Sequence, residues 1–279
     1  MAAFVCLLLA GMLLRFPKQA ILASQNALSV WAWDIVPSLF PYMVLCKMTA
    51  QRLRATRFPI APLTALLGWM GGSPSGAAML SVSADGLTPK QFHALCALTG
   101  TISPMFFIGT LQAWGIEQKT CVRLLAAHWF GALLTSICVS KLPLAQGKNV
   151  MTNKSIQAVG NPITDSVLSV LGVGGCIVFF GVTASCIRIL LPFLSEGRCA
   201  CVQAILEIAG GMRLLSQTEA SFARDVSMAA LTGFGGFSIL TQNHLFLQTY
   251  GMTQGRLFRF AVLRAMISGL VMTLLVWLI

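Results

Sequence analysis

Long apolar runs separated by short polar segments dominate this chain. The runs lie at residues 25–46, 60–82, 91–113, 121–140, 164–187, 200–218, 226–250 and 260–279, after a shorter one at 1–14. A helix that crosses the hydrocarbon core of a bilayer needs about 20 such residues. Only 10% of the residues are charged, against about 25% in soluble domains. These features exclude a water-soluble globular enzyme and predict an all-α, polytopic integral membrane protein in contact with lipid.

The excess of basic residues fits a membrane protein better than a nucleic-acid-binding one. The formal net charge is +11, but the basic residues lie in short segments between apolar runs, as at 51–57. No soluble basic domain exists, so we expect no nucleic-acid partner. Lys and Arg gather on the cytoplasmic side of membrane proteins. Placing 51–57 in the cytoplasm gives eleven basic residues inside, Arg264 among them, and eight outside.

The first 24 residues form a segment of their own in this interpretation. Residues 2–14 are apolar, but Arg15 and Lys18 follow the run rather than precede it. A cleaved signal peptide has the opposite order. We therefore expect 1–24 to be a short first span or an interfacial anchor.

The remaining chain contains an internal repeat. Ala97-Leu98-Thr99-Gly100 recurs as Ala230-Leu231-Thr232-Gly233, at an offset of 133. Further matches at an offset of 136 include Arg123 with Arg259. Internal repeats are common in transporter folds. The predicted organisation is a membrane repeat at 25–140, a basic loop at 141–163 and a second repeat at 164–279.

Several apolar runs are interrupted by glycine and proline. Residues 71–76 read Gly-Gly-Ser-Pro-Ser-Gly, and further interruptions lie at 99–104 and 232–238. Proline removes a backbone donor, and backbone groups freed inside a membrane must find other partners. The run 60–82 is therefore predicted to be a re-entrant hairpin or a discontinuous helix. If it is re-entrant, the first half crosses the membrane an odd number of times, which makes the two repeats inverted.

Polar side chains at these interruptions are the candidates for binding a solute. Hydroxyls, amides and exposed helix ends can bind a small polar solute or ion in mid-membrane. Glu207 is a carboxylate inside an apolar run, where ionisable groups are costly and often functional. Its alternative role is structural, as a partner for Arg213 or a helix-end residue. The candidate substrate-binding residues are Ser73, Pro74, Ser75, Thr99, Thr101, Ser103, Glu207, Thr232, Ser238, Thr241, Gln242 and Asn243.

Motifs for enzymatic or metal chemistry are missing from the sequence. The three histidines form no pair at helical spacing, the nine cysteines contain no CxxC pair, and no phosphate-binding glycine loop is present. We therefore expect no catalytic residue, no metal and no cofactor. Whether the chain forms a homo-oligomer stays open.

Three motifs in order resemble a known family. They are Val36-Pro37-Ser38-Leu39-Phe40-Pro41, the stretch 72–77 and the stretch 103–110. The pattern is similar to that of sporulation integral membrane proteins of the YlbJ type. These belong to a wider group with a "nucleoside recognition" or Gate domain, shared with concentrative nucleoside transporters and the membrane part of ferrous-iron transporters. The resemblance covers roughly residues 25–279.

The resemblance implies a role in spore formation and a place in a bacterial cell membrane, that of the mother cell or the forespore. Together with the polar interruptions, it favours a transporter-like protein that moves a small polar solute or ion. The alternative is a non-transporting membrane scaffold or regulator of sporulation, whose breaks serve packing. An intramembrane enzyme is the least favoured interpretation.

Overall fold

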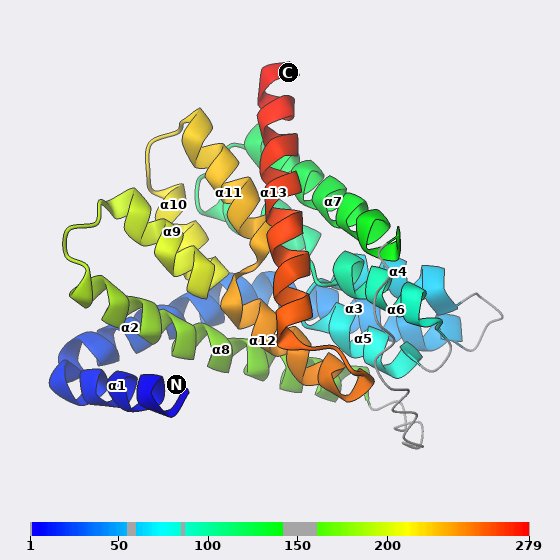
Figure 1. Ribbon diagram of the computed structural model, residues 1–279, viewed down its shortest axis with the longest axis horizontal. Coiled ribbons are helices and arrows are strands. Elements are labelled where there is room, and N and C mark those ends of the chain that lie inside the picture. Colours follow the sequence, from blue (N-terminus) through cyan, green and yellow to red (C-terminus); the bar gives the residue numbers. More distant parts are fainter. Residues whose placement is uncertain (1, 55–59, 85–86, 142–160, 279) are drawn as a thin grey trace.

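A computed structural model describes residues 2–54, 60–84, 87–141 and 161–278, and these residues contain helices and no strand (Figure 1). In the first half the helices are α1 (Ala2–Arg15), α2 (Pro17–Ser29), η1 (Val30–Ile35), α3 (Val36–Arg54), α4 (Ile60–Gly71), α5 (Ser75–Ser83), α6 (Pro89–Thr99), η3 (Phe106–Leu111) and α7 (Gln118–Lys141). The second half holds α8 (Pro162–Leu190), α9 (Glu196–Leu206), α10 (Ile208–Ser216), α11 (Phe222–Phe234), α12 (Gly236–Leu247), η4 (Gln248–Tyr250) and α13 (Gln254–Leu278). The predicted all-α fold of a polytopic membrane protein is confirmed.

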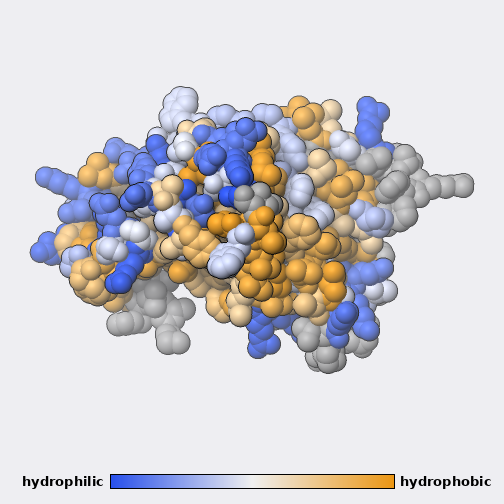
Figure 2. Space-filling model, turned by 90° about the horizontal axis from the view of Figure 1, so that it is seen from above, coloured by the Kyte–Doolittle hydropathy of each residue, from blue (hydrophilic) through white to orange (hydrophobic). Residues whose placement is uncertain are grey.

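Among the described residues, three helices are long and apolar enough to cross a bilayer on their own. They are α7, α8 and α13, with 24, 29 and 25 residues. At about 1.5 Å per residue, each is longer than the roughly 30 Å hydrocarbon core. Side chains such as Phe130, Leu171 and Leu270 are exposed on these helices, as lipid contact requires. Figure 2 shows hydrophobic residues over the middle of one face and hydrophilic residues gathered toward its left end.

The N-terminal segment is two helices joined by a sharp bend. The axes of Leu7–Arg15 and Pro17–Ile35 differ by 102°, and together they would count as a fourth span. The boundary expected after residue 24 lies inside α2, and the chain continues through the wide π-helical turn η1 into α3. The N-terminal segment and the first repeat are therefore joined by continuous helix.

Two of the interrupted runs form hairpins of short helices. Helix α4 packs against α5, and α9 packs against α10. Each of these helices has 9 to 12 residues, too few to cross a bilayer. The close approach in the second hairpin is made possible by Gly211, because a Cβ atom there would collide with the backbone of Ala204. The sequence predicted either a re-entrant hairpin or a discontinuous helix for residues 60–82, and the structure shows two helices packed as a hairpin.

The other two interruptions each end one helix shortly before the next helix begins. Helix α6 ends at Thr99 and the chain resumes helical structure near Ser103-Pro104, while α11 ends at Phe234 and α12 begins at Gly236. The second break requires glycine, because Gly235 and Gly236 have φ angles of +84° and +81°. L-residues with side chains rarely adopt this left-handed region. Backbone groups on both sides of each break lose their partners within the helix.

Both halves follow the same order of elements: a long helix, a hairpin, an interrupted helix and a final span. In the second half these are α8, α9–α10, α11–α12 and α13. Most of the predicted loop 141–163 lies at 142–160, outside the described residues; Lys141 ends α7, and Pro162 begins α8. Superposition of 25–140 on 164–279 through an axis in the membrane plane stays a prediction.

We expect the two ends of the first hairpin to lie on the same side of the membrane. In a variant without the nine native cysteines, Ala61→Cys and Lys90→Cys should react with an impermeant thiol reagent from the same side. The start of α13 lies near the start of α6, because Arg256 approaches His93 at 3.4 Å. Trp277 lies at the far end of α13, so Trp277→Cys should react from the other side. Labelling of Ala61→Cys and Lys90→Cys from opposite sides would contradict the hairpin.

Candidate functional site

A small cavity lies where the interruptions of the two halves meet. Its volume is about 60 Å³, room for a few water-sized molecules. Polar lining comes from Ser73, Ser103, Glu207, Ser238 and Gln242. All five belong to the predicted set, and they come from four separate breaks in the chain.

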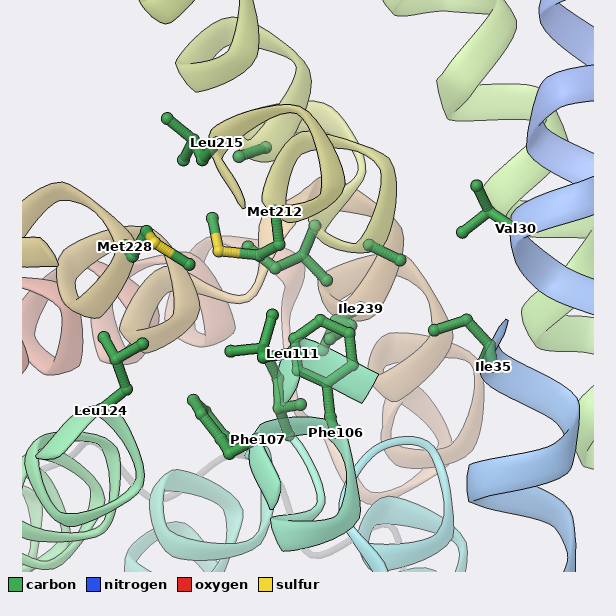
Figure 3. Packing of buried hydrophobic residues seen from close by; sticks show 14 of the residues in the cluster. Val30, Ile35, Phe106, Phe107, Leu111, Leu124, Met212, Leu215, Met228 and Ile239 are labelled. Atoms are coloured by element: carbon green, nitrogen blue, oxygen red, sulfur yellow. The ribbon is translucent and has the colours of Figure 1, made fainter. Parts of the chain in front are cut away.

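The rest of the cavity wall is apolar; part of it lies at the breaks themselves, and the other part comes from helices that the sequence did not single out. Ile35 ends η1 and Leu39 lies in the first turn of α3. Val173 and Ile177 lie on α8. Figure 3 shows Phe106 beside Ile239, with Ile35 pointing toward them from its own helix. A few polar groups on an apolar wall are the usual composition of a small-molecule site.

Glu207 lies in the break between α9 and α10 and begins α10. Its side chain is 2% exposed. Oε1 accepts a hydrogen bond from the N–H of Ala209 at 2.7 Å, and Oε2 accepts one from Gly210 at 2.6 Å. These N–H groups would otherwise be unpaired at the start of a helix, where partial positive charge also favours an anion. Glu207 therefore caps a helix, which is one of the structural roles expected for it, and it also lines the cavity. Arg213, the other structural partner considered, pairs with Asp34 at 3.2 Å.

Ser73 ties the tip of the first hairpin to both halves. Its N–H donates to the carbonyl of Thr101 at 2.6 Å, and its Oγ donates to Oδ1 of Asn243 on α12 at 2.8 Å. Asn243 lies beside the cavity rather than on its wall. The two breaks of the first half and the broken span of the second half are thus joined by direct hydrogen bonds.

The other candidates do not line the cavity. Pro74 and Ser75 are buried at the start of α5, and Thr241 is half-buried on α12. The Thr99 and Thr232 hydroxyls donate to carbonyls of their own helices, at Leu95 and at Met228, both at 2.8 Å. Thr101 contributes its carbonyl to the contact with Ser73, while its hydroxyl, like that of Ser75, has no partner within the described residues.

Arg264 is a site residue that the sequence analysis placed wrongly. It was counted among cytoplasmic residues, but its side chain is 3% exposed within α13. Its Nε donates to the carbonyl of Gly233 at 2.6 Å, and its Nη1 donates to that of Ala97 at 3.2 Å. These carbonyls lie at the ends of α11 and α6, one in each half. The sequence did contain a signal that Arg264 is buried, because it is a lone arginine inside an apolar run, five residues beyond Arg259.

His128 has a related role on α7. Its side chain is fully buried, and Nε2 accepts a hydrogen bond from the N–H of Ile102 at 3.0 Å. The offset between His128 and Arg264 is 136, the same as between Arg123 and Arg259. Each half therefore has a polar residue on its last span that contacts backbone groups freed by a break. No group of three or more His, Cys, Asp or Glu side chains suited to a metal ion occurs in the described parts of the chain.

Comparison with known proteins finds a relative. The chain is 22% identical over 296 residues to the sporulation integral membrane protein YlbJ of Bacillus subtilis (strain 168), covering 85% of this chain and 72% of the relative. The YlbJ-type resemblance is confirmed. No family model matches the chain, and no solved structure matches it. The aligned share includes most of the two halves, so the similarity to YlbJ is not limited to the short motifs.

Proposed function

We propose that this chain is a transporter-like, multi-pass protein of a bacterial cell membrane that moves a small polar solute or ion during spore formation. The observation that carries the proposal is the cavity, which is formed by breaks of both halves and holds a buried carboxylate. Broken helices that meet in mid-membrane are the usual binding sites of secondary transporters. The sporulation role rests on the name of the relative YlbJ, and the compartment is the mother-cell or forespore membrane.

The proposal assigns no reaction chemistry to the chain. The polar groups at the cavity are hydroxyls, an amide and one carboxylate that already accepts two backbone hydrogen bonds. This set suits binding by hydrogen bonds rather than nucleophilic catalysis. A Gate-domain type of architecture, with inverted repeats, is part of the same proposal.

A non-transporting scaffold or regulator is the second candidate. Its support is that much of the polar chemistry at the breaks is used internally. Ser73 bonds to Asn243, and the Thr99 and Thr232 hydroxyls bond within their helices. In that function the breaks would serve only to pack the halves together.

Glu207→Gln separates the two candidates. The amide keeps the size of the side chain and one acceptor oxygen for the α10 N–H groups, but loses the charge. We expect normal amounts of protein in the membrane and a large loss of heat-resistant spores, because loss of the charge weakens binding of the solute, tenfold for each loss of about 1.4 kcal/mol. Glu207→Asp keeps the charge and a good helix cap, and should retain more spores.

The matched control is Glu196→Gln, which changes an exposed carboxylate at the start of α9 and should leave spore counts unchanged. If Glu207→Gln sporulates normally while Glu207→Ala lowers the amount of folded protein, Glu207 is only a helix cap. The scaffold function would then be favoured over transport.

A further inference from the structure

A second, larger cavity lies next to the first. Its volume is about 540 Å³, and it lies between α2, α8 and the α9–α10 hairpin. We name it the vestibule; its polar lining includes Gln19, Asn26, Ser29, Ser185, Arg188, Gln203, Arg213 and Gln217. A volume of this size is typical of sites that admit small molecules.

The vestibule and the small cavity share part of their walls. Glu207 and Ile177 line both. The carboxylate of Glu207 is fixed at this place by the N–H groups of Ala209 and Gly210. The two spaces are therefore separated at Glu207 by the thickness of one side chain.

Exposure along the vestibule falls from the rim to the shared wall. Gln19, Arg188 and Gln217 are exposed, Gln203 is half-buried, and Glu207 is buried. Arg188 lies near the end of α8. The vestibule therefore opens at the end of α8 that is opposite to Pro162, and so opposite to the segment that joins the halves.

The residue types of the vestibule indicate that it holds water. Asn26 and Ser29 of α2 are exposed, and amide or hydroxyl groups facing lipid without partners are costly. These polar residues also explain why α2 is much less apolar than α1. A solute that enters here comes from the aqueous phase rather than from lipid.

The first hairpin closes the small cavity where it meets the second half. There Ser73 bonds to Thr101 and to Asn243, so the hairpin tip is tied to a break and to α12. Within the described part of the chain, Glu207 of the second hairpin makes no equivalent bond to the other half; its carboxylate accepts hydrogen bonds from its own helix. The Asp34–Arg213 ion pair holds α10 to η1 beside the vestibule.

From this arrangement we propose that the vestibule is the aqueous access route to the small cavity, and that the Glu207 side chain is the partition between them. The proposal rests on the transport function proposed above. It adds the side from which a water-soluble solute enters and the residue that it must pass. Shortening the Glu207 side chain should open the partition without disturbing the closed side at Ser73.

Thiol labelling in a variant without native cysteines tests the route. The probe is a membrane-impermeant cationic methanethiosulfonate, applied to each side of the membrane in turn. Ser185→Cys in the vestibule should react from one side only, the side that labels Trp277→Cys. Ser238→Cys in the small cavity should react slowly from that side.

Adding Glu207→Ser should raise the labelling rate of Ser238→Cys at least about tenfold, since serine can still cap α10 but is shorter. Glu196→Ser is the matched control, because Glu196 lines neither cavity, and it should leave the rate unchanged. If Glu207→Ser folds poorly, Glu207→Asp replaces it and should raise the rate by a smaller factor. Labelling of Ser185→Cys from the opposite side, or an unchanged rate at Ser238→Cys with the shortened side chain, would overturn the proposal.

The labelling result is independent of spore counts. If the labelling pattern is as expected but Glu207→Gln sporulates normally, the proposal of a transport function is rejected, while the proposal of a water-filled route is retained. If Glu207→Gln loses spores but the shortened side chain leaves labelling unchanged, the partition fails and the proposed function remains.

Discussion

Arg264→Ala should destabilise the folded protein by about 2–6 kcal/mol, from about 1–3 kcal/mol for each buried carbonyl left without a donor. The two carbonyls belong to Ala97 and Gly233, at helix ends where the next turn is missing. Arg264 lines neither of the two cavities, and the hydrocarbon core supplies no water to replace the guanidinium. The free energy of unfolding can be measured in mixed micelles as a function of the denaturing detergent.

The matched control for Arg264 is Arg259→Ala. Arg259 lies on the same helix but is exposed, and surface substitutions usually change stability by less than about 0.5 kcal/mol. The stability of Arg264→Lys should lie between those of the two alanine variants, because one ammonium cannot donate to both carbonyls as well as a planar guanidinium does. Equal stability of the Arg264→Ala and Arg259→Ala variants would show that the helix ends are satisfied in another way.

Gly211→Ala should separate the helices of the second hairpin and lower stability by about 3 kcal/mol, at the upper end for overpacked cores. A Cβ atom at this position meets the backbone of Ala204 rather than a side chain that could rotate away. The amount of folded protein in the membrane and its unfolding midpoint should both fall.

Gly175→Ala serves as the control for Gly211, since it also replaces a helical glycine but has open space around it. Alanine favours helix over glycine by about 1 kcal/mol, so this variant should be neutral or slightly more stable. A Gly211→Ala protein as stable as Gly175→Ala would mean that α9 and α10 are farther apart than described.

The helices and three of the four breaks could be predicted because their signals are local. Apolar runs define spans, and Gly71-Gly72-Ser73-Pro74 or Gly235-Gly236 interrupts them visibly in the sequence. The break at Leu206-Glu207 has no glycine or proline, and it is marked only by the repeat, since Glu207 follows Pro74 of the first half at the same offset of 133. A carboxylate that caps the new helix is sufficient to make that break.

The partners across the fold could not be predicted from local signals. Hydroxyls such as Thr99 and Thr232 can bond to a carbonyl one turn back in their own helix, and the sequence does not tell whether they do so or face a cavity. Arg264 was misplaced because counting charges near segment ends ignores which backbone groups elsewhere need a donor. The apolar wall from Ile35 and Val173 depends on how the first helix of each half packs.

The position of Arg264 also has a consequence for biogenesis. Its two carbonyl partners lie in α6 and α11, while the arginine itself is on α13, the last described helix. The ends of both broken spans therefore stay without this donor while the membrane insertion machinery holds only the earlier helices. Insertion of α13 completes them together, so a chain interrupted before α13 should present exposed polar backbone in the bilayer to quality-control proteases.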